Sequence, residues 1–334
     1  MGSVGYRTGL EMDCDRFDWD GATDRPLAWS AWYPVSTDDT GGNRPHGQFF
    51  DLGDVEVDRE LADSSAFPVV LLSHGTGGSP ESMGWLARRL AQNGYVVIGA
   101  HHHGNTGREP YRAEGFLCWW ERALDLSALL SMLSEYGPFS GRLDVERVHA
   151  VGFSLGGYTA LALAGARTSM DRYLSWASRS GVSSATGPRE FPNVASHIKR
   201  LLESSSTFRK SWARQDASFK DERIRSITAI APAPPVRAFD AESLQSISIP
   251  VTLISGEADT EAPSRDCADW LATINSRFDK VSIGQNVGHY TFLGFPTANV
   301  IEGEEFVFID NPGVDREDVH EAVEKIVLDV MGEA

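Results

Sequence analysis

Residues 148–157 read VHAVGFSLGG, and this stretch decides the fold. Its first residues are mostly apolar and predict a buried strand, whereas LGGYTALALA from residue 155 onward predicts a helix. GFSLG between them has the G-x-S-x-G pattern of a nucleophile elbow, a sharp strand-to-helix turn that exposes a serine. Such a turn leaves no room for side chains near the serine, which agrees with Gly152 and Gly156. Ser154 is therefore our candidate nucleophile, with a chance Gly-Ser-Gly turn as the alternative.

Strands and helices alternate on both sides of this elbow. FPVVLLS at 67–73 and YVVIGA at 95–100 are continuous apolar runs, typical of strands that are covered on both faces. A helix near 85–91 joins them, which implies a parallel crossover. The other predicted elements are a hairpin at 9–17 and 26–34, a helix at 119–136, strands at 224–231, 250–255 and 281–283, and helices at 267–274 and 314–330. This alternation predicts an α/β fold with a mostly parallel sheet flanked by helices.

Residues 166–222 break the alternation. They are rich in Ser, Arg and Lys, carry scattered aromatic side chains and show no strand pattern. The chain therefore divides into a first core part at 1–165, an insertion at 166–222 and a second core part at 223–334. We predict that the insertion is a mostly helical lid over Ser154, in which Trp176 and Trp212 contact the substrate. The alternative is a peripheral insertion whose aromatic residues only pack on the core.

The charge and composition of the chain exclude some partners. It has 30 basic and 47 acidic side chains, a net charge of −17, so its average surface repels phosphate backbones and anionic lipids. The three cysteines have a spacing that fits neither a disulfide framework nor a zinc site; they are Cys14, Cys118 and Cys267. No signal-peptide pattern and no membrane-spanning apolar run is visible. We expect a cytoplasmic protein with a small-molecule ester or acyl substrate, no nucleic acid and no stable membrane association; a homodimer stays open.

A serine hydroxyl needs a base and an orienting acid to act as a nucleophile near neutral pH. In elbow-containing α/β folds these residues follow in the order serine, acid, histidine. Asp259 in GEAD, directly after the strand at 250–255, is our first choice for the acid. Glu257 is the fallback, and either residue could instead be a solvated loop acid or a helix cap. His289, on a later loop in NVGHY, is our candidate base.

Two backbone amides are candidates for the oxyanion hole, the pair of donors that stabilises the tetrahedral intermediate. One belongs to Leu155, directly after the nucleophile, and the other to Thr76 in the HGTGG loop at 74–78. An ordinary turn and an anion-binding glycine loop are the alternatives for HGTGG. This loop lacks the G-x-G-x-x-G spacing of a dinucleotide site, so we expect no such cofactor.

Three consecutive histidines at 101–103 suggest a metal site at first sight. Consecutive residues on an extended segment point in alternating directions, so they cannot all bind one ion, and we predict no metal and no cofactor. Because the segment follows a strand, it lies at the carboxyl edge of the sheet, where substrates bind. We therefore predict that one of these histidines, His102, contacts the substrate, together with Tyr290, the neighbour of His289. The alternative is that a histidine of this segment hydrogen-bonds the loop around Asn105.

With these motifs, the chain resembles the dienelactone-hydrolase-like proteins related to platelet-activating-factor acetylhydrolases. The resemblance covers nearly the whole chain and is carried by AWYP at 31–34, LLSHGTGGSP at 71–80, NGYVVIGAHHHGNT at 93–106, VGFSLGGYTAL at 151–161, SGEADTEAP at 255–263 and GHYTFL at 288–293. It implies the α/β-hydrolase fold, with Ser154, Asp259 and His289 as the triad and the amides of Thr76 and Leu155 as the oxyanion hole. Ser154 stands where dienelactone hydrolases carry a cysteine, which argues against a dienelactone substrate.

Motifs and resemblance together predict a cofactor-independent serine hydrolase that cleaves a carboxylic ester, thioester or lactone through an acyl-enzyme intermediate. Two alternatives stay open. The same triad serves an acyltransferase, cyclase or thioesterase that acts on a carrier-bound acyl chain in a biosynthetic pathway. A non-catalytic ligand-binding protein could also use this scaffold, because a fold does not fix a function.

Overall fold

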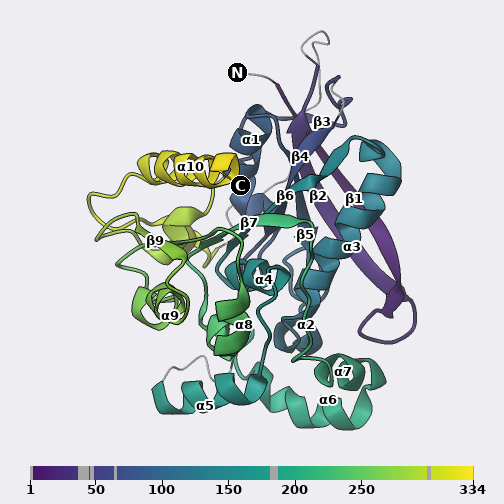
Figure 1. Ribbon diagram of the computed structural model, residues 1–334, viewed down its shortest axis with the longest axis vertical. Coiled ribbons are helices and arrows are strands. Elements are labelled where there is room, and N and C mark those ends of the chain that lie inside the picture. Colours follow the sequence, from purple (N-terminus) through teal and green to yellow (C-terminus); the bar gives the residue numbers. More distant parts are fainter. Residues whose placement is uncertain are drawn as a thin grey trace.

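One sheet organises the molecule (Figure 1). The computed structural model describes residues 3–36, 45, 49–63, 66–180, 187–298 and 302–333, and in these residues nine strands form the sheet in the order β3-β1-β2-β5-β4-β6-β7-β8-β9. The strands are β1 (Val4–Phe17), β2 (Asp24–Pro34), β3 (Glu56–Val57), β4 (Phe67–Ser73), β5 (Val96–His101), β6 (Leu143–Phe153), β7 (Ile224–Ile230), β8 (Val251–Ser255) and β9 (Phe278–Ser282). In this order, each strand from β5 to β9 runs parallel to its neighbour. The pairs β1 with β2 and β2 with β5 are antiparallel. The mostly parallel sheet expected from the sequence is confirmed.

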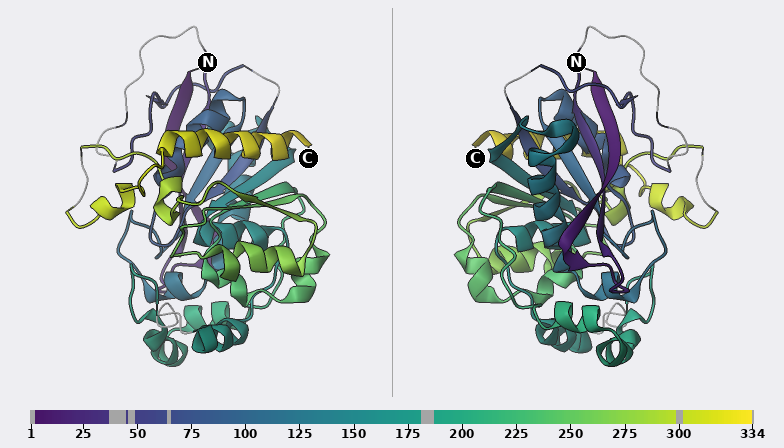
Figure 2. Two further views of the ribbon diagram at one scale, coloured as in Figure 1. Left: turned by 90° about the vertical axis from the view of Figure 1, so that its left-hand side faces the viewer. Right: turned by 90° about the vertical axis from the view of Figure 1, so that its right-hand side faces the viewer.

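Helices cover both faces of this sheet (Figure 2). One face is covered by α1 (Gly84–Gln92) and α10 (Arg316–Glu333), and the other by α3 (Glu121–Glu135), α4 (Leu155–Leu163) and α9 (Ala268–Ile274). Each face therefore has its own apolar core, which is why the central strands are apolar on both sides. The remaining α-helices of the described residues are α2 (Ala113–Leu117), α5 (Met170–Ser180), α6 (Ile198–Ser204), α7 (Ser206–Trp212) and α8 (Ala241–Ser246). Of these, α5, α6 and α7 lie together at one end of the molecule (Figure 1).

The register of the central strands brings three loops together. In β4, Val69–Ser73 pair with Val96–Ala100 of β5 on one side and with Val148–Gly152 of β6 on the other. All three strands therefore end at the same edge of the sheet, as parallel strands joined by crossovers do. The segments that leave this edge are the HGTGG loop after β4, the HHHGNT segment at the end of β5 and the elbow after β6. This edge is where a site is expected.

Edge elements differ most from the sequence prediction. β1 begins at Val4 rather than near residue 9 and pairs along β2 from Pro34 onward. β3 lies between the hairpin and β4, where the sequence pattern predicts no strand or helix, and its two residues pair with Gly5 and Tyr6. β9 spans Phe278–Ser282 rather than 281–283. Only its first residue is buried, so this edge strand carries no apolar pattern that the sequence could reveal.

Stability should fall in mild acid because buried histidines stay neutral in the folded state. Burial lowers the pKa of His320, which stacks on Trp85 with ring centroids 3.7 Å apart, to about 3. Burial likewise lowers the pKa of His149 to about 4. Unfolded histidine takes up its proton near pH ~6.5, so between this pH and the folded pKa values the unfolded chain binds more protons. The free energy of unfolding is then expected to fall with pH by up to about 1.4 kcal/mol per unit for each such histidine.

Urea unfolding of the wild type and of His320→Phe at several pH values checks this prediction. Phenylalanine keeps the stack on Trp85 but cannot titrate, so this variant should lose stability less steeply below pH ~6.5. Equal slopes for both proteins would show that His320 is not among the groups responsible.

Candidate active site

The elbow holds Ser154 in a strained backbone conformation. Its φ is 56° and its ψ −117°, values that residues other than glycine rarely adopt. A Cβ at Gly152 would lie 1.9 Å from the carbonyl oxygen of Gly156, and a Cβ at Gly156 would lie 1.9 Å from that of Ser73. Both glycines are therefore required by close backbone approach, as the G-x-S-x-G pattern predicts.

Three distant residues meet at this elbow. His289 Nε2 lies 3.0 Å from Ser154 Oγ, and His289 Nδ1 lies 2.7 Å from Asp259 Oδ2. Their exposed fractions are only 5% for Asp259 and 7% each for Ser154 and His289. A carboxylate can only accept, so Nδ1 carries the proton and Nε2 is free to accept the hydroxyl proton of Ser154. The structure thus brings together the three residues that the sequence singled out for the triad.

The loop after β8 is joined to the histidine loop by backbone hydrogen bonds. Ala258 N donates to the carbonyl of Val287 over 3.1 Å, and a Cβ at Gly256 would lie 2.2 Å from the same oxygen. This close approach places Asp259 against His289. Glu257, the fallback acid, points away and accepts a hydrogen bond from Ser282 Oγ at 2.9 Å.

The HGTGG loop packs beside the nucleophile. A Cβ at Gly75 would lie 3.3 Å from Ser154 Cβ, and Thr76 and Leu155 line the same cavity as Ser154. Leu155 is the first residue of α4, where an amide has no acceptor within the helix. Both predicted donors therefore belong to segments that line the cavity at Ser154, and these are the two segments from which an oxyanion hole is built in such folds.

The HHHGNT segment supports this loop instead of contacting a substrate at His102. The Asn105 side chain accepts from Gly77 N at 2.6 Å, and Thr106 Oγ1 donates to the carbonyl of Gly78 at 3.0 Å. The exposed fraction of His102 is 1%, and its ring bonds Ser73 Oγ at 3.0 Å, so its predicted contact with the substrate is wrong. Sequence reasoning had placed this segment near the pocket without assigning Asn105 a role.

The three consecutive histidines point to different partners. His101 Nε2 lies 3.0 Å from Ser30 Oγ, while His103 Nδ1 lies 2.8 Å from Glu109 Oε1. The part of the chain that the structure describes contains no group of three or more His, Cys, Asp or Glu side chains that could hold a metal ion. Its three cysteines are free thiols.

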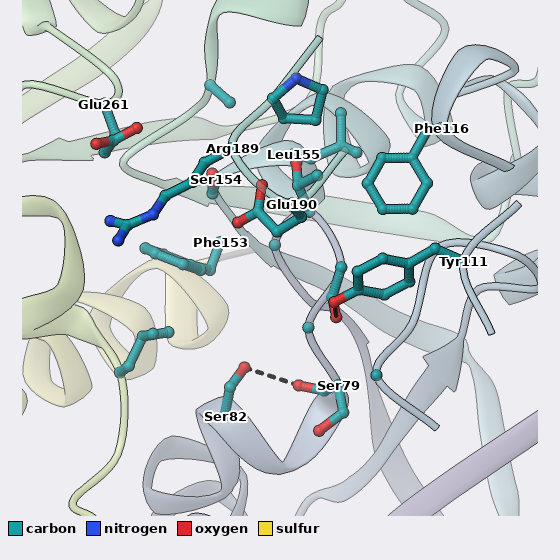
Figure 3. Close-up of a pocket in the computed structure, with 18 of the residues that line it drawn as sticks. Ser79, Ser82, Tyr111, Phe116, Phe153, Ser154, Leu155, Arg189, Glu190 and Glu261 are labelled. Carbon is teal, nitrogen blue, oxygen red and sulfur yellow. Dashed lines mark hydrogen bonds between the residues drawn. The ribbon is translucent and has the colours of Figure 1, made fainter. Parts of the chain in front are cut away.

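A cavity of about 1310 Å³ opens at Ser154. Figure 3 shows Phe116 on one side of Ser154 and Phe153 with Glu261 on the opposite side. The ring of Phe153 packs against His289 with centroids 4.8 Å apart, so this second side is the histidine side. Tyr290, predicted to contact the substrate, lines the cavity.

Neither tryptophan that we assigned to the substrate lines this cavity. Trp176 packs against Tyr173 and lines a separate, smaller depression. In α5, Met170, Tyr173 and Leu174 form the i, i+3, i+4 stripe that faces the cavity, and Trp176 lies off that stripe. Trp212 packs against Phe208 and Trp120 in the core, with ring centroids 5.3 and 5.8 Å away. Composition alone did not reveal which face of each helix turns inward.

The fold and the site are those of a known family. A sequence model of the alpha/beta hydrolase family matches residues 69–302, and the chain therefore belongs to this family. The matched range contains Ser154, Asp259 and His289. The described residues contain no helix long and apolar enough to cross a membrane.

The individual proteins that match this chain in sequence are only distantly similar to it. Cutinase est1 and cutinase est2 of Thermobifida alba are each 25% identical to this chain over 134 residues, 40% of its length. The match spans 42% and 41% of the two cutinases, about two fifths of their length. The resemblance to dienelactone-hydrolase-like proteins stays a prediction within the wider family.

Two solved structures share the fold. The ferulic acid esterase from Streptomyces cinnamoneus has a TM-score of 0.59 at 15% identity, over 99% of this chain and 89% of that one. A puromycin-hydrolysing peptidase of Mycobacterium tuberculosis has a TM-score of 0.52 at 13% identity, over 98% of this chain and 39% of that one. At such identities these likenesses concern the fold alone.

Proposed function

We propose that this chain is an esterase that hydrolyses carboxylic esters through an acyl-enzyme at Ser154. The observation that carries the proposal is the hydrogen-bond chain from Ser154 through His289 to Asp259, with distances of 3.0 and 2.7 Å. This geometry activates a serine for acyl transfer on any fold that provides it. The sequence similarity to proteins named cutinase supports an ester as the substrate.

The reaction follows from the positions of these groups. Ser154 Oγ attacks the carbonyl carbon as its proton passes to His289 Nε2, and the carbonyl oxygen becomes an oxyanion that the amides of Thr76 and Leu155 stabilise. When the intermediate collapses, the bond to the alcohol oxygen breaks and His289 gives its proton to that oxygen. Water then attacks the acyl-enzyme with His289 as base, releasing the acid and restoring Ser154.

A fluorophosphonate probe and a panel of p-nitrophenyl esters test the proposal. The probe should label Ser154, located by peptide mass spectrometry, and the panel should show turnover without any added cofactor. A protein that neither reacts with the probe nor hydrolyses any ester would be the non-catalytic binding protein. Turnover that requires an added alcohol or thiol acceptor would point to acyl transfer instead.

The geometry also gives the substrate an orientation. Because His289 protonates the departing alcohol, the alcohol part lies on the histidine side of the cavity, near Tyr290 and Glu261. The acyl part then lies on the opposite side, near Phe116 of α2 and near α5, whose Tyr173 packs against Trp119 with ring centroids 4.9 Å apart. The lining residues Phe116, Leu117 and Trp119 are apolar, which favours an apolar acyl group.

The cavity-facing residues of the 166–222 insertion should set the preference for acyl length. Leu174 and Ile198 line the cavity from α5 and α6. Shortening either side chain removes apolar contacts with remote parts of a long acyl group, and such contacts tune specificity. Leu174→Ala and Ile198→Ala are each expected to lower the ratio of kcat/KM for a long-chain ester to that for an acetate ester by about 10-fold.

Trp212→Ala is the matched control within the same insertion. Trp212 packs against Trp120 away from the cavity, so its loss should lower the thermal midpoint and leave the ratio between the esters unchanged. If Leu174→Ala and Ile198→Ala behaved like Trp212→Ala, the insertion would be peripheral to substrate selection.

A further inference from the structure

Arg122 is a buried cation behind the active site. It lies on α3 with an exposed fraction of 2%, and its guanidinium donates to neutral oxygens. Asp125, one turn along the same helix, is bonded to Arg25 and Arg16 instead. Burial lowers the pKa of Arg122 to about 9, so the group remains charged near neutral pH. Burying a charge without a contacting counter-ion costs stability, and such costs are most often retained where they serve function.

The Arg122 guanidinium contacts both segments that carry the oxyanion donors. On one side, Nη2 donates to the carbonyl of His74, two residues before Thr76. On the other side, Nε donates to Thr159 Oγ1 at 3.1 Å, and this hydroxyl donates to the carbonyl of Leu155 at 3.2 Å. One planar group thus links the HGTGG loop to the first turn of α4.

A second hydrogen-bond chain supports the loop from behind. Ser73 Oγ lies 3.0 Å from His102 Nε2, and His102 Nδ1 lies 3.1 Å from Asp125 Oδ2. This chain has the donor order of the catalytic triad, but each of its members is only 1% exposed, so a substrate cannot reach Ser73. Arg122 Nη2, 3.4 Å from Ser73 Oγ, joins the chain at the end of β4. The starting point of the HGTGG loop is therefore held by a buried hydrogen-bond network, in which Arg122 Nη1 is left without a partner.

We propose that Arg122 is a positioning residue that fixes the spacing of the two oxyanion-hole amides, those of Thr76 and Leu155. The inference rests on the proposed esterase function, since the hole has a task only if a carbonyl reacts at Ser154. Oxyanion donors are effective only when they are already aimed at the place where charge develops. A displacement of about 1 Å can cost on the order of 100-fold in rate.

Two variants test the proposal. Arg122→Lys keeps the positive charge but ends in a single ammonium, which cannot bridge both segments as a guanidinium does. It is expected to lower kcat per active site by about 10–100-fold with little change in KM. Thr159→Val keeps the side-chain shape but removes the oxygen that Arg122 Nε bonds, and a smaller decrease of the same kind is expected.

The decisive readout is the inhibition constant of a trifluoromethyl ketone, whose hemiketal with Ser154 puts an oxyanion in the hole. For both variants it should rise by the same factor by which kcat/KM falls, because both quantities report on transition-state stabilisation. Active sites are counted from the end point of fluorophosphonate labelling, so a partly unfolded sample cannot imitate the effect. Arg142→Lys is the matched control: Arg142 Nη2 bonds the carbonyl of Ala62, away from the site, and its kinetics should equal the wild type.

Two failures can be told apart. A lower thermal midpoint with unchanged kcat per labelled site and unchanged inhibition, in both variants, would make Arg122 purely structural and overturn this proposal alone. A wild type that neither hydrolyses esters nor reacts with the fluorophosphonate would overturn the esterase function and this proposal with it.

Discussion

Ser154→Ala is expected to lower kcat for an activated ester by roughly 10⁶-fold. The variant keeps the cavity and the oxyanion amides but has no oxygen that can form an acyl-enzyme. About 10³-fold acceleration over water should remain, because binding and the oxyanion donors still act on a direct attack by water. Burst kinetics with a p-nitrophenyl ester measure the effect, since the initial burst reports acylation and should vanish completely.

Ser226→Ala is the matched control for this variant. Ser226 is also a buried serine next to a histidine, with its Oγ 2.8 Å from His149 Nδ1, but it lies within β7 away from the elbow. Its loss should leave kcat unchanged. A Ser154→Ala protein with wild-type turnover and an intact burst would remove Ser154 from the mechanism.

The central part of the fold could be predicted because its signals are local. β4 is a continuous apolar run, β6 is buried over its last six residues, and both strands end in glycine-rich turns; Gly152 and Gly156 are required by close backbone approach. The triad followed from chain order, since the loops after successive parallel strands meet at one edge of the sheet. Ser154 and His289 could therefore be assigned without knowing how the side chains pack.

Side-chain direction was the information that the sequence lacked. Trp176 was expected at the substrate, but the inward stripe of α5 runs through Tyr173 and Leu174. His102 was expected in the cavity, yet its ring turns below the HGTGG loop toward Asp125. In both cases the backbone lies near the site. Whether the side chain reaches the cavity depends on the face of the helix that Trp176 occupies and on the side of the extended segment to which His102 points.

Arg122 went unnoticed for a related reason. A signal was present, because WWERALDLSALL places Arg122 and Asp125 three residues apart in an otherwise largely apolar helix. Charges near a helix start are commonly solvated, however, and only the packing of α3 against β4 and α4 reveals that this turn is buried. The burial of a charged side chain thus depends on tertiary packing, which the sequence pattern of a single helix does not reveal.

The largest expected effect after the nucleophile belongs to the acid. Asp259→Asn should lower kcat by about 10⁴-fold, because an amide can donate to the imidazole and so favours the tautomer in which Nε2 carries the proton. That tautomer cannot accept the proton of Ser154. The substitution keeps the size of the side chain, and the second oxygen, Oδ1, can still accept from the backbone amides of Glu261 and Ala262, now 2.9 and 2.7 Å away. The loop should therefore remain folded, which thermal denaturation verifies.

Glu257→Gln decides whether this effect is specific to one carboxylate. Glu257 lies two residues before Asp259 on the same loop, and the sequence alone left both open as the acid. Its carboxylate bonds Ser282 Oγ at 2.9 Å, whereas Asp259 Oδ2 lies 2.7 Å from His289 Nδ1. Removing one negative charge from this loop has the same long-range electrostatic consequence in either variant, so only the contact with the imidazole separates them. Steady-state kinetics should give near-wild-type kcat for Glu257→Gln; the opposite ranking of the two variants would transfer the role of the acid to Glu257.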